Sequence, residues 1–78
     1  MFQVRIKAYG GLSRYLPGQK GIATFSVPEG ATVRDLLRQA GIPEPEVWLV
    51  AAGDKEVKVE EPLWDGAELS VFAQVAGG

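Results

Sequence analysis

The sequence contains no cysteine and no histidine, and each absence excludes a class of site. A chain without cysteine forms no disulfide, offers no thiolate nucleophile and lacks the soft sulfur ligand of many zinc sites. A chain without histidine lacks the side chain that most often acts as a general base near neutral pH. The acidic residues between positions 54 and 61 are irregularly spaced, so they do not predict a site for a hard cation either. We therefore predict a protein that is not an enzyme and that binds no metal and no cofactor.

The chain also lacks length and long apolar runs. With 78 residues it is expected to form one domain, and a domain of this size buries only about 60% of the surface that its unfolded chain exposes. No apolar run approaches the roughly 20 residues that cross a bilayer, and the first residues do not have the layout of a signal peptide. We expect a cytoplasmic protein that does not engage a membrane.

The net charge is −2, but the two halves of the chain differ in sign. Residues 1–40 carry six Lys or Arg and two acidic residues, whereas residues 41–78 carry two Lys and eight acidic residues. Nucleic-acid binding requires a dominant basic face, which this distribution does not predict. The acidic half is able to steer the chain toward a basic protein surface, and ordinary solvated charge explains the same pattern equally well.

Alternating apolar and polar residues predict two strands, each with one buried face, over residues 2–9 and 22–27. The two strands are expected to pair in an antiparallel manner. The segment 10–21 between them is rich in glycine and proline, so we predict a loop with one helical turn after Ser13.

A short amphipathic helix is predicted to begin at Val33. Thr32 is a typical N-cap residue, and Asp35 stands three positions later, where an acid also interacts favourably with the helix dipole. Gly41 suits the left-handed residue that follows a helix. The apolar residues are spaced so that they form one stripe for packing on a sheet: Val33, Leu36, Leu37 and Ala40.

Three further strands are expected in the second half of the chain. The apolar run 47–51 is typical of a central strand covered on both faces. Val57 and Val59 predict a short edge strand, and residues 68–72 again alternate. The fold class is therefore α+β, with a mixed sheet of about five short strands packed on one helix. This is the β-grasp arrangement of ubiquitin-like domains, and a generic α+β roll is the alternative.

The alternating pattern stops after Phe72, and the sequence ends in small residues and two glycines. We predict a β-grasp domain over residues 1–72 and a flexible C-terminal tail over residues 73–78. Six extended residues reach about 20 Å. Because glycine has no Cβ, Gly77 and Gly78 would fit a narrow channel of a partner protein and leave the final carboxylate accessible.

Three motifs together resemble the ubiquitin-like sulfur carriers, a family that includes the small subunit of molybdopterin synthase and the thiamine-pathway sulfur carrier. The motifs are residues 31–37 after a Pro-Glu-Gly turn, residues 62–66 before the last strand, and residues 75–78 at the end. They span essentially the whole chain. The sequence departs from the family pattern at residues 52–55, where relatives commonly have an Asn-Gly turn, and at Gln74, where a proline is common.

The resemblance implies a chemical role for the terminal carboxylate. In the family, an adenylating enzyme like the ubiquitin-activating (E1) enzymes uses ATP and magnesium to join this carboxylate to AMP, and a persulfide sulfur then yields a thiocarboxylate. Gly78 would carry the sulfur, and Gly77 would allow the tail to enter the partner. The thiocarboxylate would donate its sulfur in cofactor biosynthesis, and the expected acceptor is the molybdopterin synthase large subunit or another sulfur acceptor that builds a cofactor.

Aromatic side chains and the tail are the expected contacts with these partners: Phe72, Gln74, Val75, Ala76, Trp48 and Trp64. For Phe72 and the two tryptophans, burial in the core and exposure at an interface are equally open. Phe2 is assigned to the core.

Two other functions fit the same sequence. A ubiquitin-like protein modifier, conjugated to lysines through Gly78, would have the same fold and the same tail. A noncovalent β-grasp interaction domain would have an incidental Gly-Gly end, and deletion of Gly77 and Gly78 would leave its function intact.

Overall fold

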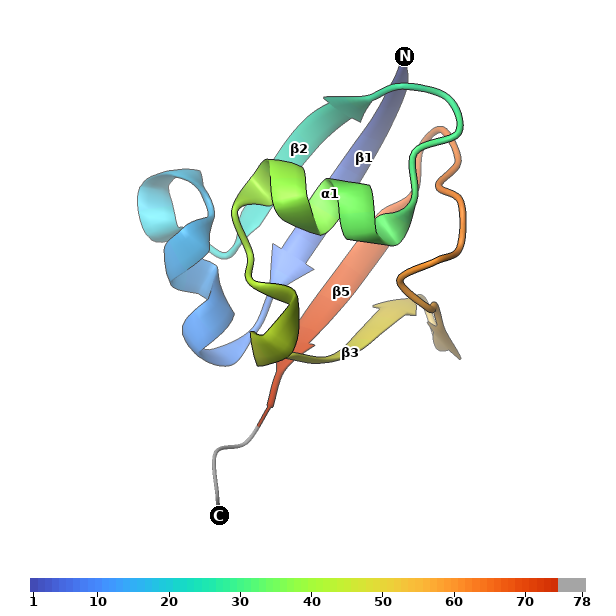
Figure 1. Ribbon diagram of the computed structural model, residues 1–78. Coiled ribbons are helices and arrows are strands. Elements are labelled where there is room, and N and C mark those ends of the chain that lie inside the picture. The colour runs from blue at the N-terminus through green and yellow to red at the C-terminus, as the bar shows by residue number, and fades with distance from the viewer. Residues whose placement is uncertain (75–78) are drawn as a thin grey trace.

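The computed structural model describes residues 1–74 (Figure 1). The described chain contains five strands and one α-helix: β1 (Phe2–Ala8), β2 (Ile22–Val27), α1 (Val33–Ala40), β3 (Val47–Ala52), β4 (Lys55–Glu56) and β5 (Glu68–Ala73). It also contains three short 3₁₀ helices: η1 (Gly10–Tyr15), η2 (Pro17–Gln19) and η3 (Glu44–Glu46).

The strands form one mixed sheet in the order β2-β1-β5-β3-β4. β1 and β5 pair in parallel, whereas the other neighbouring strands are antiparallel. In Figure 1, α1 lies across one face of this sheet. The predicted α+β class, with a mixed five-stranded sheet packed on one helix, is confirmed over the described residues.

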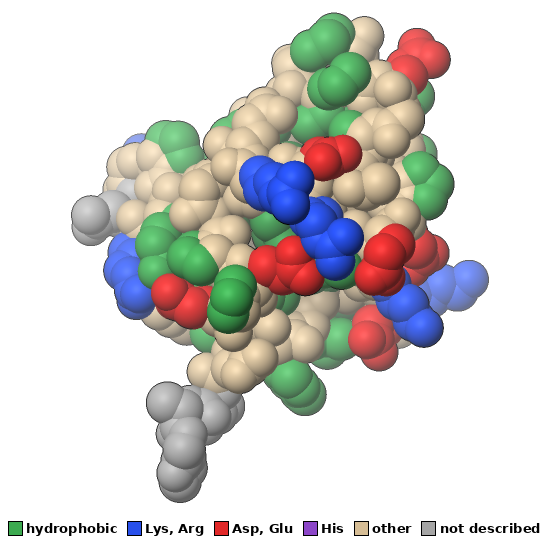
Figure 2. Space-filling model, viewed as in Figure 1, with side chains coloured by type: hydrophobic (Ala, Val, Ile, Leu, Met, Phe, Trp, Pro, Cys, Tyr) green, Lys and Arg blue, Asp and Glu red, His purple; other side chains and the backbone are tan. Residues whose placement is uncertain are grey.

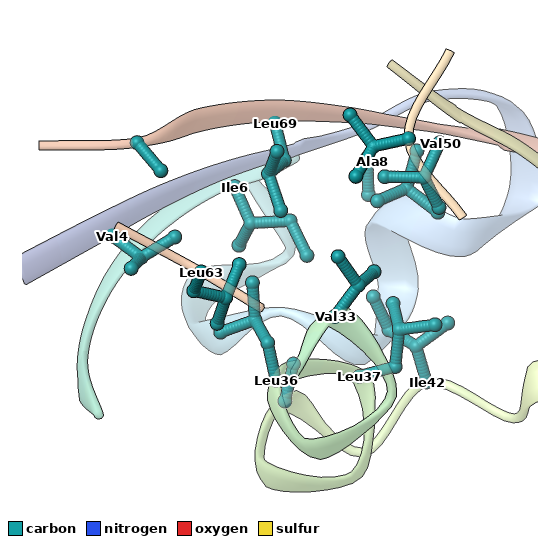
Figure 3. Packing of buried hydrophobic residues seen from close by; sticks show 14 of the residues in the cluster. Val4, Ile6, Ala8, Val33, Leu36, Leu37, Ile42, Val50, Leu63 and Leu69 are labelled. Carbon is teal, nitrogen blue, oxygen red and sulfur yellow. The ribbon is translucent and has the colours of Figure 1, made fainter. Parts of the chain in front are cut away.

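The core lies between α1 and the sheet, and it follows from the apolar stripe of the helix. Val33, Leu36 and Leu37 are buried and face the sheet, where Ile6 and Leu69 are buried in turn (Figure 3). Full burial of one such side chain stabilises the fold by about 1.5–3 kcal/mol relative to exposure. Among the side chains that the structure describes, which are those of residues 1–18 and 20–74, no polar or charged one is buried.

Both ends of α1 have the predicted caps. The Thr32 hydroxyl accepts a hydrogen bond from the Asp35 N–H (3.3 Å), and the Asp35 carboxylate accepts one from the Thr32 N–H (3.0 Å). The bond from the Thr32 N–H is the largest cause that lowers the pKa of Asp35. At the other end Gly41 adopts a left-handed backbone (φ 81°), and the N–H of the buried Ile42 donates to the Leu37 carbonyl (2.9 Å).

The run 47–51 does not form a central strand covered on both faces, so this prediction is wrong. β3 lies second from the edge of the sheet, and its Trp48 side chain is 67% exposed. The physical reason is that α1 covers only one face of the sheet. A register shift between Val47 and Leu49 also interrupts the alternation of β3 at Trp48.

The predicted short edge strand is present as β4, but its predicted position around Val57 and Val59 is wrong, because β4 comprises only two residues and ends before this segment. After β4 the chain turns toward the start of α1. There the carbonyls of Val59 and Glu61 accept hydrogen bonds from the N–H groups of Arg34 (2.9 Å) and Val33 (3.1 Å). The first N–H groups of a helix have no partner within the helix, and this segment supplies one for each.

Two further boundaries differ from the prediction. The helical turn expected after Ser13 begins earlier, at Gly10, because η1 and the residue after it bury Leu12 and Leu16 against the core. β5 ends at Ala73, one residue beyond the predicted strand, because Ala73 still pairs with Val47 of β3.

Candidate functional site

Four of the predicted site residues lie outside the described residues: Val75, Ala76, Gly77 and Gly78. The structure shows where the chain leads into them. The Gln74 N–H donates a hydrogen bond to the Glu46 carbonyl (3.1 Å), and the Gln74 side-chain amide donates one to the Val47 carbonyl (3.4 Å). We call Ala73 and Gln74 the root of the C-terminal segment, because these hydrogen bonds attach the chain to η3 and to the start of β3.

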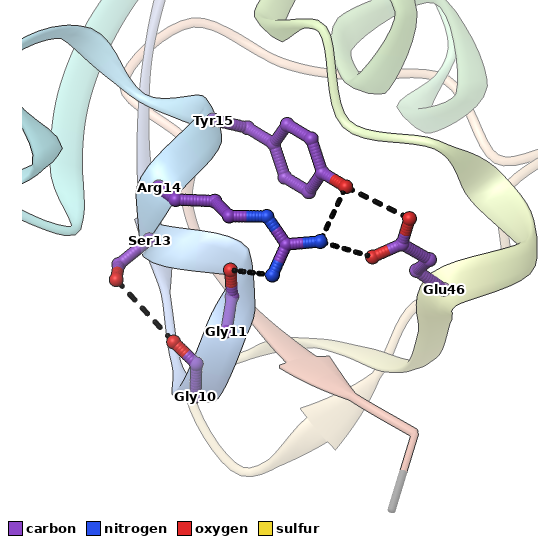
Figure 4. Close-up of polar contacts among 6 residues, drawn as sticks. All are labelled: Gly10, Gly11, Ser13, Arg14, Tyr15 and Glu46. Carbon is purple, nitrogen blue, oxygen red and sulfur yellow. Dashed lines mark hydrogen bonds and ion pairs between the residues drawn. The ribbon is translucent and has the colours of Figure 1, made fainter. Parts of the chain in front are cut away.

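Three side chains form a hydrogen-bonded cluster beside the root (Figure 4). The Glu46 carboxylate accepts one hydrogen bond from the Tyr15 hydroxyl (2.8 Å) and one from the Arg14 guanidinium (3.2 Å). Arg14 also donates to the Tyr15 hydroxyl (2.8 Å) and to the Gly11 carbonyl (3.1 Å). We call Arg14, Tyr15 and Glu46 the η1–η3 cluster, because these residues join the two 3₁₀ helices.

The face of the sheet opposite α1, here called the open face, carries an aromatic stack. Successive side chains of a strand point to opposite faces, so the buried Val71 places its neighbour Phe72 on the open face. The Phe72 ring stacks on the Tyr9 ring, with centroids 4.9 Å apart and planes inclined by 8°. Leu49 pairs with Phe72 in the register of β3 and β5 and therefore faces the same side. We call Tyr9, Leu49 and Phe72 the open-face platform.

Charged side chains accompany the platform on the open face. Arg5 and Lys7 alternate with buried residues of β1, and Arg5 forms an exposed ion pair with Glu68 of β5 (3.7 Å). Exposed ion pairs of this kind contribute little to stability. An apolar patch with polar surroundings is typical of a protein-docking surface.

The two predicted tryptophans lie outside the core, and neither belongs to the platform. Trp48 lies at the register shift of β3, and Trp64 is 44% exposed in the connection before β5. Phe72 is half-buried in the platform, directly before the root, whereas Phe2 is half-buried and packs against the core. Of the three aromatic candidates, Phe72 is thus the one that the fold places next to the C-terminal segment.

Paired charges are found on the side of the molecule where α1 lies. The Arg34 guanidinium donates two hydrogen bonds to the Glu44 carboxylate (2.8 and 3.3 Å) and approaches Glu60 at 3.9 Å. The hydrogen bonding between Arg34 and Glu44 raises the pKa of Arg34 and lowers that of Glu44. Figure 2 shows Lys and Arg side chains next to Asp and Glu side chains over this side.

Sequence reasoning did not identify Tyr9, Leu49 or the η1–η3 cluster as site residues. Tyr9 continues the alternation of outward-facing residues that begins with Arg5 and Lys7. This alternation would have been sufficient to place Tyr9 on the outer face of the sheet. No sequence signal joins Tyr15 to Glu46, because these residues are 31 positions apart and meet only in the folded chain.

Within residues 1–74, no group of three or more acidic side chains is placed to hold a metal ion. No helix in the described part of the chain is long and apolar enough to cross a membrane. What the described arrangement offers is an aromatic platform on the open face, next to the point where residues 75–78 begin.

Comparisons with known proteins agree with this arrangement. The model of a protein family described as Mut7-C ubiquitin matches residues 1–76. No curated protein matches the sequence. Among solved structures, small archaeal modifier protein 1 from Haloferax volcanii is 18% identical, with a TM-score of 0.77, and the match covers 96% of this chain and 100% of the other.

Two solved structures of molybdopterin-converting factors are also similar. A putative subunit 1 from Pyrococcus furiosus is 24% identical, with a TM-score of 0.71 and coverage of 96% of this chain and 100% of the other. A chain in the complex of subunits 1 and 2 from Helicobacter pylori is 19% identical, with a TM-score of 0.61 and coverage of 99% and 100%. The predicted β-grasp fold is therefore confirmed, and the family match confirms the predicted resemblance to ubiquitin-like proteins, with structures of molybdopterin-converting factors among those that share the fold.

Proposed function

Because the chain belongs to the Mut7-C ubiquitin family, we propose that it is a sulfur carrier whose Gly78 carboxylate is adenylated by a partner enzyme and converted into a thiocarboxylate. The observation that supports this proposal most strongly is the whole-length structural likeness to the putative molybdopterin converting factor subunit 1 from P. furiosus. The sequence adds the Gly77-Gly78 pair that the chemistry needs. In this account the described body docks on partner enzymes, and Gly78 is the group that reacts.

A carboxylate must be activated before any nucleophile attacks it, because its negative charge makes it a poor electrophile. Attack of the Gly78 carboxylate oxygen on the α-phosphate of ATP forms the acyl adenylate and releases pyrophosphate, with ATP and magnesium held by the partner. A persulfide sulfur then displaces AMP, and a second thiol cleaves the S–S bond to leave the thiocarboxylate. None of these steps requires a cysteine or histidine of this chain, which has neither.

The open-face platform is the proposed contact with the partner enzymes. The Tyr9 and Phe72 rings are already stacked, so little side-chain freedom is lost when a partner covers them. Docking at Phe72 also holds the nearby root, and thus the C-terminal segment, close to the partner and raises its effective concentration there. The factor from H. pylori is a complex of subunits 1 and 2, and we propose a molybdopterin synthase large subunit as the corresponding acceptor here.

A second candidate function is supported by the likeness to small archaeal modifier protein 1. In a protein modifier, Gly78 would be joined to lysines of target proteins. Both candidates begin with the same acyl adenylate, and they differ in the nucleophile that displaces AMP. In the carrier it is a persulfide sulfur, and in the modifier it is an amine.

The activation step is tested by ATP–pyrophosphate exchange with the candidate adenylating enzyme of the same organism. Three proteins are compared: the unaltered chain, a chain that lacks Gly78, and a chain with one alanine added after Gly78. We expect exchange with the unaltered chain alone. Equal melting temperatures are expected for all three, because the core lies within residues 1–74. Equal exchange by all three proteins would contradict the role of Gly78, and no exchange by any of them would favour a noncovalent interaction domain.

The products separate the two candidate functions. A thiocarboxylate is detected by its rapid alkylation and is expected for the carrier. Lysine-linked conjugates persist on denaturing gels and are expected for the modifier.

A further inference from the structure

We propose that the η1–η3 cluster is a positioning device that fixes the root of the C-terminal segment, so that only the residues after Gln74 have to be ordered in a partner's active site. The attachment of the root involves described residues alone. The effect of this attachment on insertion into a partner rests on the proposed function.

The cluster fixes the end of η3 against η1. The Glu46 carboxylate uses both of its oxygens, one for the Arg14 guanidinium and one for the Tyr15 hydroxyl. The Arg14 guanidinium lies 4.7 Å from the centroid of the Tyr15 ring and is itself held by the Gly11 carbonyl. Two charge-assisted hydrogen bonds therefore converge on one carboxylate, and the contact between Arg14 and the Tyr15 ring holds the two donors together, so that the position of residue 46 is defined (Figure 4).

The backbone of the fixed residue then holds the root. The Glu46 carbonyl accepts the hydrogen bond from the Gln74 N–H, and the neighbouring Val47 carbonyl accepts the one from the Gln74 side chain. The other end of η3 is also attached, because Glu44 is hydrogen-bonded to Arg34 of α1. The acceptors of Gln74 are therefore the last residue of a short helix that is tied to the body at both ends and the first residue of β3 that follows it.

η1 approaches the root from the other side. The Tyr9 N–H donates to the Val71 carbonyl of β5 (2.9 Å). A Cβ placed on Gly10 would come within 3.5 Å of the Ala73 Cβ, so the start of η1 runs close to the root. Residues of η1, η3 and the root together line a groove of about 340 Å³. The end of β5 thus lies close to both η1 and η3, the two helices that the cluster joins.

Global stability does not explain the cluster well. The side chains of Arg14 and Glu46 are 59% and 43% exposed, and ion pairs at this exposure contribute little to the free energy of unfolding. A positional role needs no large stabilisation. Each root residue that is released adds the backbone of one more residue that must be ordered when the C-terminal segment enters the partner. The entropy lost in this ordering lowers the equilibrium constant for productive binding on the order of tenfold.

The test compares Tyr15→Phe and Glu46→Gln, singly and together, with Glu29→Gln as a matched control in an exposed turn. Tyr15→Phe keeps the half-buried ring and removes only the hydroxyl, which accepts a hydrogen bond from Arg14 and donates one to Glu46. Amide hydrogen exchange of Gln74 is followed by NMR in the free protein, with the Tyr9 amide as an internal reference.

We expect exchange of Gln74 to accelerate at least about tenfold in the double variant, while Tyr9 exchange and the melting temperature stay near the values of the control. With the adenylating enzyme, kcat is expected to fall on the order of tenfold, while KM is retained because the open-face platform is intact.

Unchanged protection of Gln74 in the double variant would overturn the proposal. Parallel acceleration of Tyr9 and Gln74 would overturn it as well, because the cluster would then be an ordinary stabilising contact. Faster exchange of Gln74 with an unchanged kcat would show that the cluster holds the root but does not help the C-terminal segment to enter the active site of the adenylating enzyme. If the unaltered chain is not adenylated, the proposed function fails, and the exchange measurement still decides whether the cluster holds the root.

Discussion

The two faces of the sheet are built from the same strands but differ in what covers them. On the face under α1, Val4, Ile6 and Val71 are fully buried. On the open face, Arg5 and Lys7 are exposed, and Tyr9 is 45% exposed although it stacks on Phe72. Since alternate residues of one strand serve opposite faces, the core and the proposed docking surface use separate sets of side chains. Substitutions on the two faces should therefore have separable effects.

The largest loss of stability is expected from Leu36→Ala on the covered face. Leu36 is fully buried, so its truncation removes apolar contacts and leaves a cavity. The free energy of unfolding should fall by about 2–5 kcal/mol, measured by urea denaturation. Arg38→Ala, on the exposed side of the same helix, is the control and should change it by no more than about 0.5 kcal/mol. Equal effects of the two substitutions would mean that the helix face is misassigned.

On the open face, Tyr9→Ser should weaken docking without unfolding the protein. Removal of the exposed ring breaks the stack with Phe72, and the dissociation constant for the adenylating enzyme should rise by about tenfold or more. The measurement is isothermal titration calorimetry. Thr24→Ala, on β2 of the same face, is the control. An unchanged affinity for Tyr9→Ser would remove the platform from the interface.

Thr32→Ala tests the N-cap of α1. The substitution removes the hydroxyl that accepts the Asp35 N–H, so the free energy of unfolding should fall by about 0.5–2 kcal/mol. Thr32→Ser keeps the acceptor and should retain most of the stability. If alanine and serine behave alike in thermal denaturation, the hydroxyl does not act as a cap.

The smallest expected effect is a loss of thermal stability at acidic pH. The pKa of Asp35 is lowered by the Thr32 N–H, and that of Glu44 by its hydrogen bond with Arg34. A lowered pKa in the folded state stabilises the protein above the unfolded-state value of about 4, and this contribution is lost as the pH falls through the lowered pKa. The melting temperature should thus decrease between about pH 5 and pH 3. Asp35→Asn should flatten this decrease, and an identical pH profile for both proteins would contradict the assignment.

The parts of the fold that depend on local patterning could be predicted from the sequence. The stripe of α1, its Thr32–Asp35 cap and the left-handed Gly41 follow from spacing within a few residues, and each is present. The position of β3 could not be predicted in this way. An apolar run such as 47–51 looks alike whether one face or two are covered, and only the packed helix decides between them.

In the candidate site, too, some features follow from the local sequence and others arise only when distant segments pack together. Phe72 was recognisable as an aromatic next to the C-terminal segment, but its partner Tyr9 is distant in the sequence and is brought to it by the parallel pairing of β1 with β5. The contact between Tyr15 and Glu46 likewise depends on where η3 is placed by the rest of the fold. The predicted roles of Gly77 and Gly78 remain predictions, since these residues lie outside the described part of the chain.

The most direct test of the account is the intact mass of the protein after incubation with ATP, magnesium, a sulfur donor and a soluble extract of its organism. We predict a mass increase equal to the exchange of one oxygen for one sulfur, and no increase in a chain that lacks Gly78. An unchanged mass in an extract that activates a known sulfur carrier would contradict the account, and lysine-linked adducts in its place would show a protein modifier instead.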